Sequence, residues 1–264
     1  MKVSVVIPAH NEEQTLPWVL RDLNDTIARL PHDDFEVICV DDHSTDATAN
    51  VARQFGATIV ENEGRCGKGC ALRVGFARAN GDVIVMMDAD YSHRPEDLPV
   101  FLQTLTGATG LVIGSRVFGG SDEYTHVRAL GNVFLSAALG LSTRRYLSDA
   151  LNGYKAFRRD VFTDFTYTST AFEIEIELIA NALRKGYKVV ECSCHERARA
   201  GGQAKSFVIR HGTRFLLRII WEGLRGVKSR TPMVAGTPAG ASLKTSDNDP
   251  VVHGRAAQTV LLDK

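Results

Sequence analysis

The first ninety residues alternate between short apolar runs and longer segments in which apolar side chains recur every three or four positions. Short continuous apolar runs are typical of strands buried on both faces of a parallel sheet, whereas the longer spacing is typical of helices that cover such a sheet. The predicted strands occupy residues 3–7, 35–40, 57–60 and 83–87. The helical pattern is clearest in Leu16, Val19, Leu20, Leu23 and Ile27. This order of strand and helix predicts an α/β nucleotide-binding half.

The fourth apolar run ends at two acids one residue apart, Asp88 and Asp90. They lie at the carboxyl end of the predicted strand, where open α/β sheets bind ligands. Two carboxylates this close would repel each other unless a cation lay beside them, and a hard divalent ion is the natural occupant. The alternative is that both acids form a turn and cap the helix that begins near Pro95. An isolated Asp-x-Asp pair does not decide between the two, so the neighbouring motifs must.

Polar motifs also follow the other predicted strands. Pro8 ends the first strand, because proline cannot donate to a ladder, and the acidic segment 41–46 follows the second. A basic, glycine-rich loop at 64–69 precedes the next helix and could cradle a phosphate there. It is not a Walker A motif, because Gly69 stands where Ser or Thr is required, and no G-x-G-x-x-G follows the first strand. The pattern disfavours a nicotinamide dehydrogenase and favours a metal-bridged diphosphate.

The composition narrows the class of protein to which the chain can belong. The chain has 264 residues, of which 44% are hydrophobic and 23% charged, with 31 basic against 31 acidic side chains. These values describe an ordinary soluble globular protein and argue against a general nucleic-acid binder. No run approaches the roughly 18 apolar residues of a membrane-spanning helix, and no signal-peptide pattern opens the chain, so we expect a cytoplasmic protein. The five cysteines include no C-x-x-C pair and are expected to be free thiols.

Taken together, the motifs resemble those of family 2 glycosyltransferases with the GT-A fold. Their order and separation match over about residues 1–225, and the later motifs resemble the polyprenyl-phosphate hexose synthases, of which dolichol-phosphate mannose synthase is the best known. The resemblance implies one catalytic domain with a mixed, mainly parallel sheet flanked by helices. The segments that carry it are 8–12, 40–46, 67–69, 88–90, 114–116, Arg128 with Asn132, 149–153 and 199–205.

On the donor side, the resemblance implies a nucleotide pocket beside a metal site. Asp88 would face the sugar nucleotide, and Asp90 would bind Mg²⁺ or Mn²⁺ with it. The family often has a glutamine two residues after the second acid, where this chain has Ser92, which leaves the third metal contact open. The pocket residues would be Pro8, Ala9, Glu12, Val40 and Asp42, and the cations on the donor phosphates Lys68, Arg199 and Lys205.

On the acceptor side, an anionic acceptor that approaches an anionic donor needs positive charge between them. Arg128 and Asn132 lie four residues apart on one face of a predicted helix, 127–139. With Arg116 they would hold an acceptor phosphate, the arginines as planar forks and Asn132 as an amide donor. A phosphate acceptor requires no protein base, whereas a hydroxyl acceptor does, and Asp149 is then the candidate. The predicted catalytic residues are Asp88, Asp90, Arg116 and Asp149.

The last third of the chain contributes a helix and a tail. Glu173, on a predicted helix at 171–182, resembles a family acid near the sugar or the acceptor. A helix over about 207–225 mixes apolar and basic side chains, which suits either core packing or a membrane interface. The composition then turns polar and aperiodic, so we expect a disordered tail over 229–264. The predicted catalytic domain is therefore 1–228.

These patterns predict a metal-dependent, inverting hexosyltransferase. The donor would be a nucleotide-diphosphate sugar, either GDP-mannose or a UDP-hexose, and the acceptor a dolichyl or undecaprenyl phosphate reached by peripheral contact with the cytoplasmic membrane face. One alternative is transfer to a soluble hydroxyl acceptor, and another is a nucleotide-binding scaffold without turnover. A nucleotidyltransferase also has a basic glycine loop, but that loop usually follows the first strand directly. Nucleic acid is not an expected partner.

Overall fold

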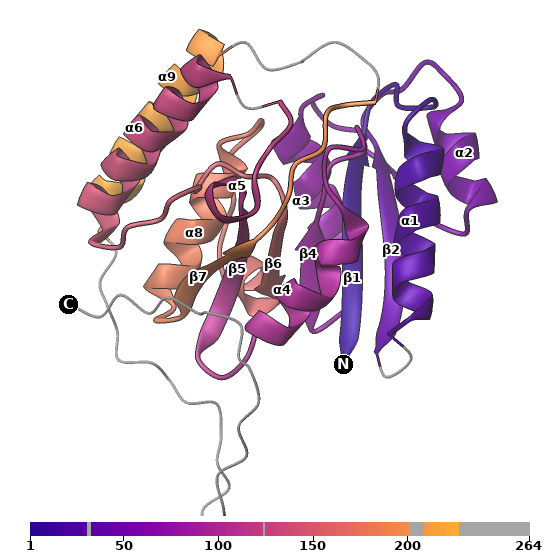
Figure 1. Cartoon of the computed structure of the whole chain (residues 1–264), viewed down its shortest axis with the longest axis horizontal. Helices are drawn as coiled ribbons and strands as arrows, with labels where there is room; N and C mark the ends of the chain where they lie inside the picture. Colours follow the sequence, from indigo (N-terminus) through magenta and orange to yellow (C-terminus); the bar gives the residue numbers. More distant parts are fainter. Residues whose placement is uncertain (31–32, 124, 201–207, 227–264) are drawn as a thin grey trace, which may run out of the picture. The chain divides into compact units, whose positions relative to one another are not determined.

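A single mixed sheet organises the protein in the computed structural model, which describes residues 1–30, 33–123, 125–200 and 208–226 (Figure 1). In these residues seven strands follow the order β3-β2-β1-β4-β6-β5-β7. They are β1 (Lys2–Ala9), β2 (Asp34–Asp41), β3 (Thr58–Glu61), β4 (Val83–Met86), β5 (Thr109–Ser115), β6 (Lys155–Arg158) and β7 (Lys188–Ser193). Only β6 runs antiparallel to its neighbours among these described strands, so the mixed, mainly parallel sheet is confirmed.

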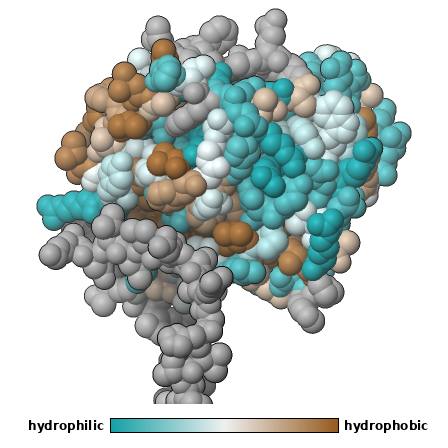
Figure 2. All heavy atoms as spheres, viewed as in Figure 1, coloured by the Kyte–Doolittle hydropathy of each residue, from teal (hydrophilic) through white to brown (hydrophobic). Residues whose placement is uncertain are grey.

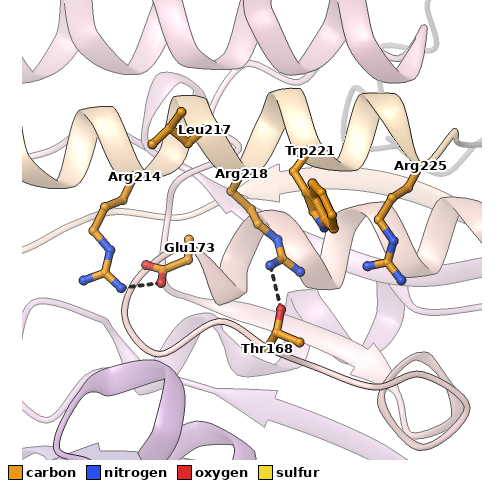
Figure 3. Close-up of a pocket in the computed structure, with 7 residues that line it drawn as sticks. All are labelled: Thr168, Glu173, Arg214, Leu217, Arg218, Trp221 and Arg225. Atoms are coloured by element: carbon orange, nitrogen blue, oxygen red, sulfur yellow. Dashed lines mark hydrogen bonds and ion pairs between the residues drawn. The ribbon is translucent and has the colours of Figure 1, made fainter.

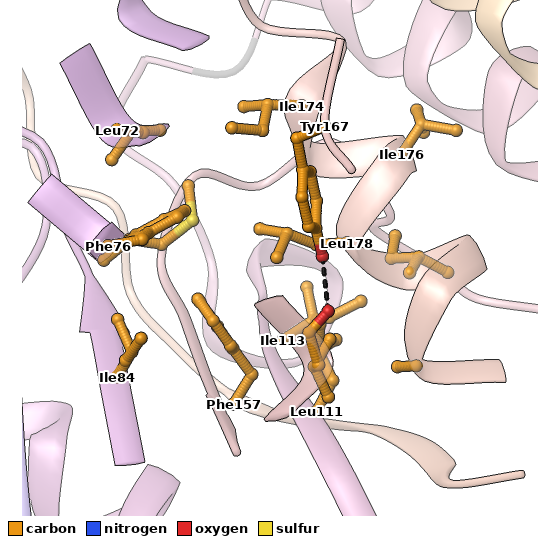
Figure 4. Packing of buried hydrophobic residues seen from close by; sticks show 14 of the residues in the cluster. Leu72, Phe76, Ile84, Leu111, Ile113, Phe157, Tyr167, Ile174, Ile176 and Leu178 are labelled. Atoms are coloured by element: carbon orange, nitrogen blue, oxygen red, sulfur yellow. Dashed lines mark hydrogen bonds between the residues drawn. The ribbon is translucent and has the colours of Figure 1, made fainter. Parts of the chain in front are cut away.

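The central strands are apolar on both faces because helices cover both sides of the sheet. Along β4, Ile84 and Met86 belong to one hydrophobic core and Val83 and Val85 to the other, as the two-residue period of a strand requires. Figure 4 shows the first core, where α3 (Lys68–Arg78) and α8 (Ile174–Arg184) pack on the sheet. The second core is formed with α1 (Leu16–Ala28) and α4 (Leu98–Thr104). Burial on both sides explains the uninterrupted apolar run before Asp88.

The acids after β4, Asp88 and Asp90, do not cap the helix that follows. A 3₁₀ turn, η1, begins at Pro95 with Arg94 in the cap position and no side-chain cap bond. Asp88 and Asp90 therefore leave the helix start alone and remain at the edge of the sheet. The other described helices are α2 (Thr48–Gln54), α5 (Arg116–Gly119), α6 (His126–Thr143), α7 (Asp160–Thr163) and α9 (Val208–Leu224).

Two of these helices, α6 and α9, pack side by side (Figure 1), and both bury apolar and polar side chains. On α6, the side chains of Asn132, Ser136 and Thr143 are buried together with two leucines. Apolar side chains lie on the outside of both helices, and Figure 2 shows them gathered in one region of the surface. The large exposed ones are Val127, Leu130, Val133, Phe134, Leu141, Leu217, Ile220, Trp221 and Leu224. This surface, called the α6–α9 face below, is apolar where the outer side of a water-exposed helix is usually polar.

Several boundaries differ from the sequence predictions. The predicted helix 127–139 is the longer α6, which Thr125 caps by accepting from the N–H of Arg128. The predicted helix 207–225 is α9, and among the described helices none is long and apolar enough to cross a membrane. Sequence analysis missed β6, because a four-residue strand beside a polar loop has no clear period. The predicted tail, 229–264, lies outside the described residues.

Candidate active site at the carboxyl edge of the sheet

Asp88 lies directly beyond the carboxyl end of β4, next to the centre of the sheet edge. The first residue of α3, Lys68, places its Nζ 2.7 Å from Oδ1 of Asp88. Burial alone would raise the pKa of Asp88, but the neighbouring cations, led by Lys68, outweigh burial and hold this pKa well below its ordinary value. The carboxylate is therefore ionised at neutral pH and carries a cation supplied by the chain itself.

Lys68 points into the protein rather than toward solvent. Besides Asp88, its ammonium lies 3.2 Å from Oε1 of Glu175 and 5.0 Å from the ring centroid of Phe172. Burial would lower the pKa of Lys68, but the two carboxylates raise it above its ordinary value. The preceding Gly67, at φ 148°, allows this entry, because a Cβ there would lie 2.4 Å from the carbonyl oxygen of Thr170. The predicted phosphate-binding lysine thus touches the metal-site acid.

Asp90 is held by its own loop and by a distant arginine. Its Oδ1 accepts from the N–H and the hydroxyl of Ser92, at 3.1 and 2.6 Å, and its Oδ2 lies 3.1 Å from Nε of Arg199. The next residue, His93, accepts the N–H of Asp88 at its Nδ1, 3.0 Å away, and burial lowers the pKa of His93. Ser92 and His93 therefore orient the two acids, and their contacts leave the third metal contact open.

The two carboxylates fit a hard divalent ion. The chain already balances each of them with a cation, Lys68 on Asp88 and Arg199 on Asp90, so this position requires positive charge. Mg²⁺ and Mn²⁺ take oxygen ligands and often complete their shell with substrate phosphates. Within the described residues, no three acidic, histidine or cysteine side chains gather into a ready-made metal cluster. A metal here would thus have Asp88 and Asp90 as its protein ligands and take its remaining ligands from the donor.

Arg116 and Asp149 form a bidentate pair on the other side of this edge. Nε and Nη2 of Arg116 each lie 2.7 Å from an oxygen of Asp149, which is fully buried. The second carboxylate on Arg116 is Glu196, at 3.2 Å from Nη1. Because both oxygens of Asp149 accept from Arg116, Asp149 positions this arginine and is poorly placed to take a proton from a hydroxyl acceptor. Its role as a base stays a prediction without geometric support.

Arg128 belongs to a chain of charges that reaches the donor side. Its Nη1 lies 3.7 Å from Glu123, whose other contact is Arg199, the partner of Asp90. Arg199 also donates its N–H to Glu123 at 2.9 Å. Asn132, one turn along α6, is buried and donates its amide to the carbonyl of Ser148 at 3.2 Å, and its Oδ1 has no partner among the described residues. Of the predicted acceptor residues, Arg128 is thus connected to Asp90 through Glu123 and Arg199, whereas Lys205, predicted on the donor phosphates, lies outside the described residues.

The predicted nucleotide-pocket residues adjoin at the ends of β1 and β2. Pro8 is in register with Val40, and the N–H of Asp42 donates to the carbonyl of Ala9 at 2.8 Å. Glu12 follows in the next turn, where its N–H donates to Thr48 at 2.8 Å. The side chain of Val40 is fully buried, so a nucleotide would meet its backbone. The roles of these residues toward a nucleotide stay predictions.

The Asp42 carboxylate ties this pocket to the glycine-rich loop. It accepts from the amide of Asn62 at 2.6 Å and from the N–H of Gly67 at 2.8 Å. Cys66 lies in the same loop, with its Sγ 3.4 Å from Asp42 Oδ2. The loop therefore forms one wall of the pocket beside the metal-site acids. All five cysteines are free thiols, as predicted.

The loop 149–153 rests on a buried lysine. Nζ of Lys155, the first residue of β6, donates to the carbonyls of Ala150, at 3.2 Å, and Asn152. Burial lowers the pKa of Lys155 to about 8, although Glu175 acts in the opposite direction. The loop is thus fixed from below by a cation that the core isolates from solvent.

A pocket of about 540 Å³ lies between α9 and the segment before α8 (Figure 3). Nη2 of Arg214 lies 2.6 Å from Glu173, and Arg218 pairs with Glu177 and, at 2.7 Å, with Glu222. Because these arginines are balanced by carboxylates, they anchor α9 to α8. Glu173, which we expected near the sugar or the acceptor, serves this anchor. The lining residues are Thr168, Glu173, Arg214, Leu217, Arg218, Trp221 and Arg225.

Sequence analysis missed three charged residues of the site. Glu175 and Lys155 are buried at 1% and 0% exposure, and Glu123 joins Arg128 to Arg199. One signal in the sequence could have indicated them. Three glutamates alternate with isoleucines at the start of a short helix, so the helix cannot bury its isoleucines without burying a glutamate as well. A fully buried acid must find a cation, so the pattern E-I-E-I-E could have predicted buried ion pairs.

Comparison with known proteins identifies the family of this chain. Residues 4–166 match the sequence profile described as "Glycosyl transferase family 2". An undecaprenyl-phosphate mannosyltransferase of Micrococcus luteus is 32% identical over 249 residues, covering 85% of this chain and 98% of that protein. A dolichol-phosphate mannosyltransferase of Pyrococcus furiosus is 30% identical over 235 residues, covering 84% of this chain and 65% of that protein. The chain thus spans less than two thirds of the Pyrococcus relative.

Solved structures agree on the fold. A glucosyl-3-phosphoglycerate synthase from Mycobacterium tuberculosis, in complex with Mn²⁺, UDP-glucose and phosphoglyceric acid, superposes with a TM-score of 0.65 at 26% identity. The match covers 83% of this chain and 79% of that structure. The sheet order and the single domain described above are those of the GT-A fold. This chain belongs to glycosyl transferase family 2 and is a glycosyltransferase.

Proposed function

We propose that the protein transfers a hexose, with inversion and with the help of a divalent cation, from a nucleotide-diphosphate sugar to a polyprenyl phosphate. Two relatives, at 30% and 32% identity, are named for transfer to dolichol phosphate and undecaprenyl phosphate. The solved relative that holds UDP-glucose and Mn²⁺ supports the donor class and the cation. The base and the sugar of the donor stay open between GDP-mannose and UDP-hexoses.

The observation that carries this proposal is that α6 has polar groups on its inner side and exposed apolar side chains on its outer side. This helix bears Arg128 and Asn132 at the inner site, and its outer side exposes Leu130 and Phe134 at 72% and 60%. A lipid-borne phosphate is an anion on an apolar chain, so both of its parts find a matching surface on one helix. A soluble acceptor would have no use for the apolar half.

The α6–α9 face supports peripheral contact with a membrane. Its apolar side chains are exposed, while Arg214 and Arg218 of α9 pair with the buried glutamates Glu173 and Glu177. Exposed apolar patches of this kind mark interaction sites, and an amphipathic helix pair can lie in the lipid interface. Trp221, 54% exposed, suits the depth of the headgroups.

On the donor side, Asp88 and Asp90 would hold Mg²⁺ or Mn²⁺, which supplies Lewis-acid stabilisation to the diphosphate leaving group. Lys68 keeps Asp88 ionised and oriented, and Arg199 can leave Asp90 to neutralise a phosphate. Asp42 and the glycine-rich loop form the wall that a nucleotide would contact. The carboxylates thus serve departure of the nucleotide rather than proton transfer.

On the acceptor side, the nucleophile would be a phosphate oxygen. A phosphate monoester is anionic at neutral pH, so no side chain has to remove a proton. Arg128 would bind this oxygen group, and Arg116, which Asp149 and Glu196 hold in place, would add positive charge beside it. Attack from the face opposite the leaving diphosphate forms the new bond as the old one breaks, which inverts the anomeric centre.

A second candidate is transfer to a soluble acceptor. It is favoured by the solved relative from Mycobacterium tuberculosis, whose complex holds phosphoglyceric acid. In that case the arginines would bind the acid groups of a small acceptor, and the attacking hydroxyl would require a base.

One experiment separates the two candidates. Purified protein is incubated with GDP-mannose or UDP-glucose, with Mn²⁺ or EDTA, and with short-chain polyprenyl phosphate in detergent or 3-phosphoglycerate. We expect glycolipid product from one donor, dependent on Mn²⁺, and none from 3-phosphoglycerate. Product from 3-phosphoglycerate alone would replace our proposal with the second candidate.

A further inference from the structure

Four charged groups form a chain from the partly exposed donor-side acid into the core, where the last two, Glu175 and Lys155, are buried. Lys68 lies between Asp88, at 2.7 Å, and Glu175, at 3.2 Å. The second oxygen of Glu175 lies 3.8 Å from Nζ of Lys155 and accepts no hydrogen bond from the described part of the chain. The signs alternate along the chain and sum to zero, so each group is balanced only while its neighbours stay in place.

The far end of this chain holds the loop on the acceptor side. Lys155 donates to the carbonyls of Ala150 and Asn152, inside the loop 149–153. The same loop begins with Asp149, the partner of the catalytic candidate Arg116. A displacement of Lys155 would therefore move the backbone that fixes an acceptor-side arginine.

The same loop also touches the donor end of the chain. A Cβ on Gly153 would lie 2.8 Å from Nζ of Lys68 and 3.0 Å from Oδ2 of Asp88. The backbone of Gly153 thus packs against that ion pair, and a larger residue there would displace the ammonium of Lys68. The loop is bound by Lys155 at one point and packs on Lys68 at another. Glu175 contacts both of these lysines and so connects the two points.

We propose that Glu175 and Lys155 are positioning residues that couple the charge state of the donor side to the acceptor-side loop 149–153. When a cation and a diphosphate engage Asp88, Lys68 is left with Glu175 as its main partner. Glu175 then moves toward Lys68. The ammonium of Lys155 either moves with Glu175 or loses its neutralising carboxylate, and the loop carbonyls that it binds shift as a result. Donor occupancy in this way alters the loop that presents Arg116 to the acceptor. The donor and acceptor named here rest on the proposed function, but the mechanical link does not.

Hydrogen exchange of the loop amides tests the link directly. We compare native protein with Glu175→Gln, each alone and with Mn²⁺ plus UDP or GDP. In the native protein, Mn²⁺ with the correct nucleotide should change exchange in residues 149–153. In Glu175→Gln the loop should exchange about tenfold faster without ligand, and the ligand should no longer change it. Unchanged loop exchange in folded Glu175→Gln would overturn the inference.

Glu177→Gln is the matched control. Glu177 lies two residues away on α8, is equally buried at 1% exposure, and faces Thr168 and Arg218. It should lower thermal stability comparably while leaving exchange in the loop 149–153 as in the native protein. Equal loop loosening in both variants would mean that any loss of charge on α8 disturbs the loop, and would also overturn the link.

Kinetics give a readout that a merely structural role would not move. Lys155→Met should raise the KM for the acceptor about tenfold and leave the donor KM within about twofold. The double variant Glu175→Gln/Lys155→Met restores charge balance and should be less impaired than the product of the single effects. Additive effects would contradict the chain. If Glu175→Gln does not fold, the Lys155→Met comparison with native protein carries the test.

Failure of the proposed function gives a different result. If neither nucleotide changes any part of native protein, the donor assignment fails, while faster loop exchange in Glu175→Gln without ligand still supports the link. If native protein transfers sugar to another acceptor, the same KM comparison is made with that acceptor.

Discussion

The donor side and the acceptor side of the site are built in different ways. On the donor side, Asp42, Asp88 and Asp90 lie where β2 and β4 end, so the sheet itself places them. On the acceptor side, the guanidinium of Arg116 is held by the carboxylate of Asp149, thirty-three residues away in the sequence. This pair forms only when the loop 149–153 packs beside the end of β5. Strand ends thus place the donor-side acids, whose cations Lys68 and Arg199 come from other parts of the chain, whereas Arg116 follows β5 but is oriented by a carboxylate from a distant loop. The orientation of Arg116 should therefore be sensitive to substitutions far from it in the sequence.

The largest effect is expected at Asp90, the metal-site acid that Arg199 contacts. Asp90→Ala should lower turnover by about a thousandfold, because it removes a ligand of the charge-stabilising cation. Thermal shift should show loss of the stabilisation by Mn²⁺ with nucleotide. Asp164→Asn, at a carboxylate that pairs with Lys185 on the surface, should leave both readouts unchanged. Turnover that survives in Asp90→Ala would break the donor half of the comparison.

The next effect concerns the α6–α9 face. Leu130→Glu with Leu224→Glu, at side chains 72% and 79% exposed, should weaken binding to anionic vesicles by about a hundredfold. The fold should be retained because neither side chain is buried, and turnover in detergent should change little. Val100→Glu places the same charge on α4 at a 42% exposed position and should leave vesicle binding intact. Equal vesicle binding by all three proteins would remove the membrane contact from the account.

A smaller effect separates the two sides kinetically. Arg128→Ala should raise the acceptor KM about tenfold while donor affinity, measured by nucleotide titration, survives. Its guanidinium is half-buried and contacts Glu123, so the fold should tolerate the change. If donor and acceptor affinities fell together, Arg128 would belong to the Glu123–Arg199 network of the donor side instead.

The smallest effect is a pH dependence. Because burial lowers the pKa of Lys155 to about 8, its charged contact with the loop is lost as the pH rises through 8. The groups that face it are Glu175, Lys68, Asp149 and Arg116. We expect the acceptor KM to rise about threefold between pH 7 and 9.

The loss of this charged contact at high pH does not reflect unfolding of the protein. Between about pH 8 and the ordinary lysine pKa of 10.5, the unfolded chain binds more protons at Lys155 than the folded protein does. This lysine therefore makes the free energy of unfolding larger as the pH rises through that window. Lys155→Arg stays charged and should remove the rise in acceptor KM. An unchanged pH profile in Lys155→Arg would assign the rise to another group.

The sequence predicted the donor side better than the acceptor side for a physical reason. An apolar run that stops at Asp88 and Asp90 specifies a buried strand and places the acids at its end, all within eight residues. Arg116 and Asp149 were identified as site residues, but their mutual pairing depends on tertiary packing. Glu175 and Lys155 were missed because their meaning arises only when α8 and β6 come together.

The inward turn of Lys68 was also beyond sequence analysis. A basic glycine loop before a helix is typical of a phosphate site, and we expected Lys68 to be a cation on the donor phosphates. Burial of Glu175 under the same loop draws the ammonium into the core instead. The pattern identified the right loop, and a distant acid decided where its side chain points.

The central claim is that Asp88 and Asp90 hold a cation together with the donor diphosphate. A crystal structure of the protein soaked with Mn²⁺ and a nucleotide sugar, phased to reveal the metal by its anomalous signal, tests it most directly. We predict an Mn²⁺ peak within coordination distance of both carboxylates and the diphosphate, with Arg199 moved off Asp90. A bound donor with no metal at this position, and with Lys68 and Arg199 still on the two acids, would contradict the account.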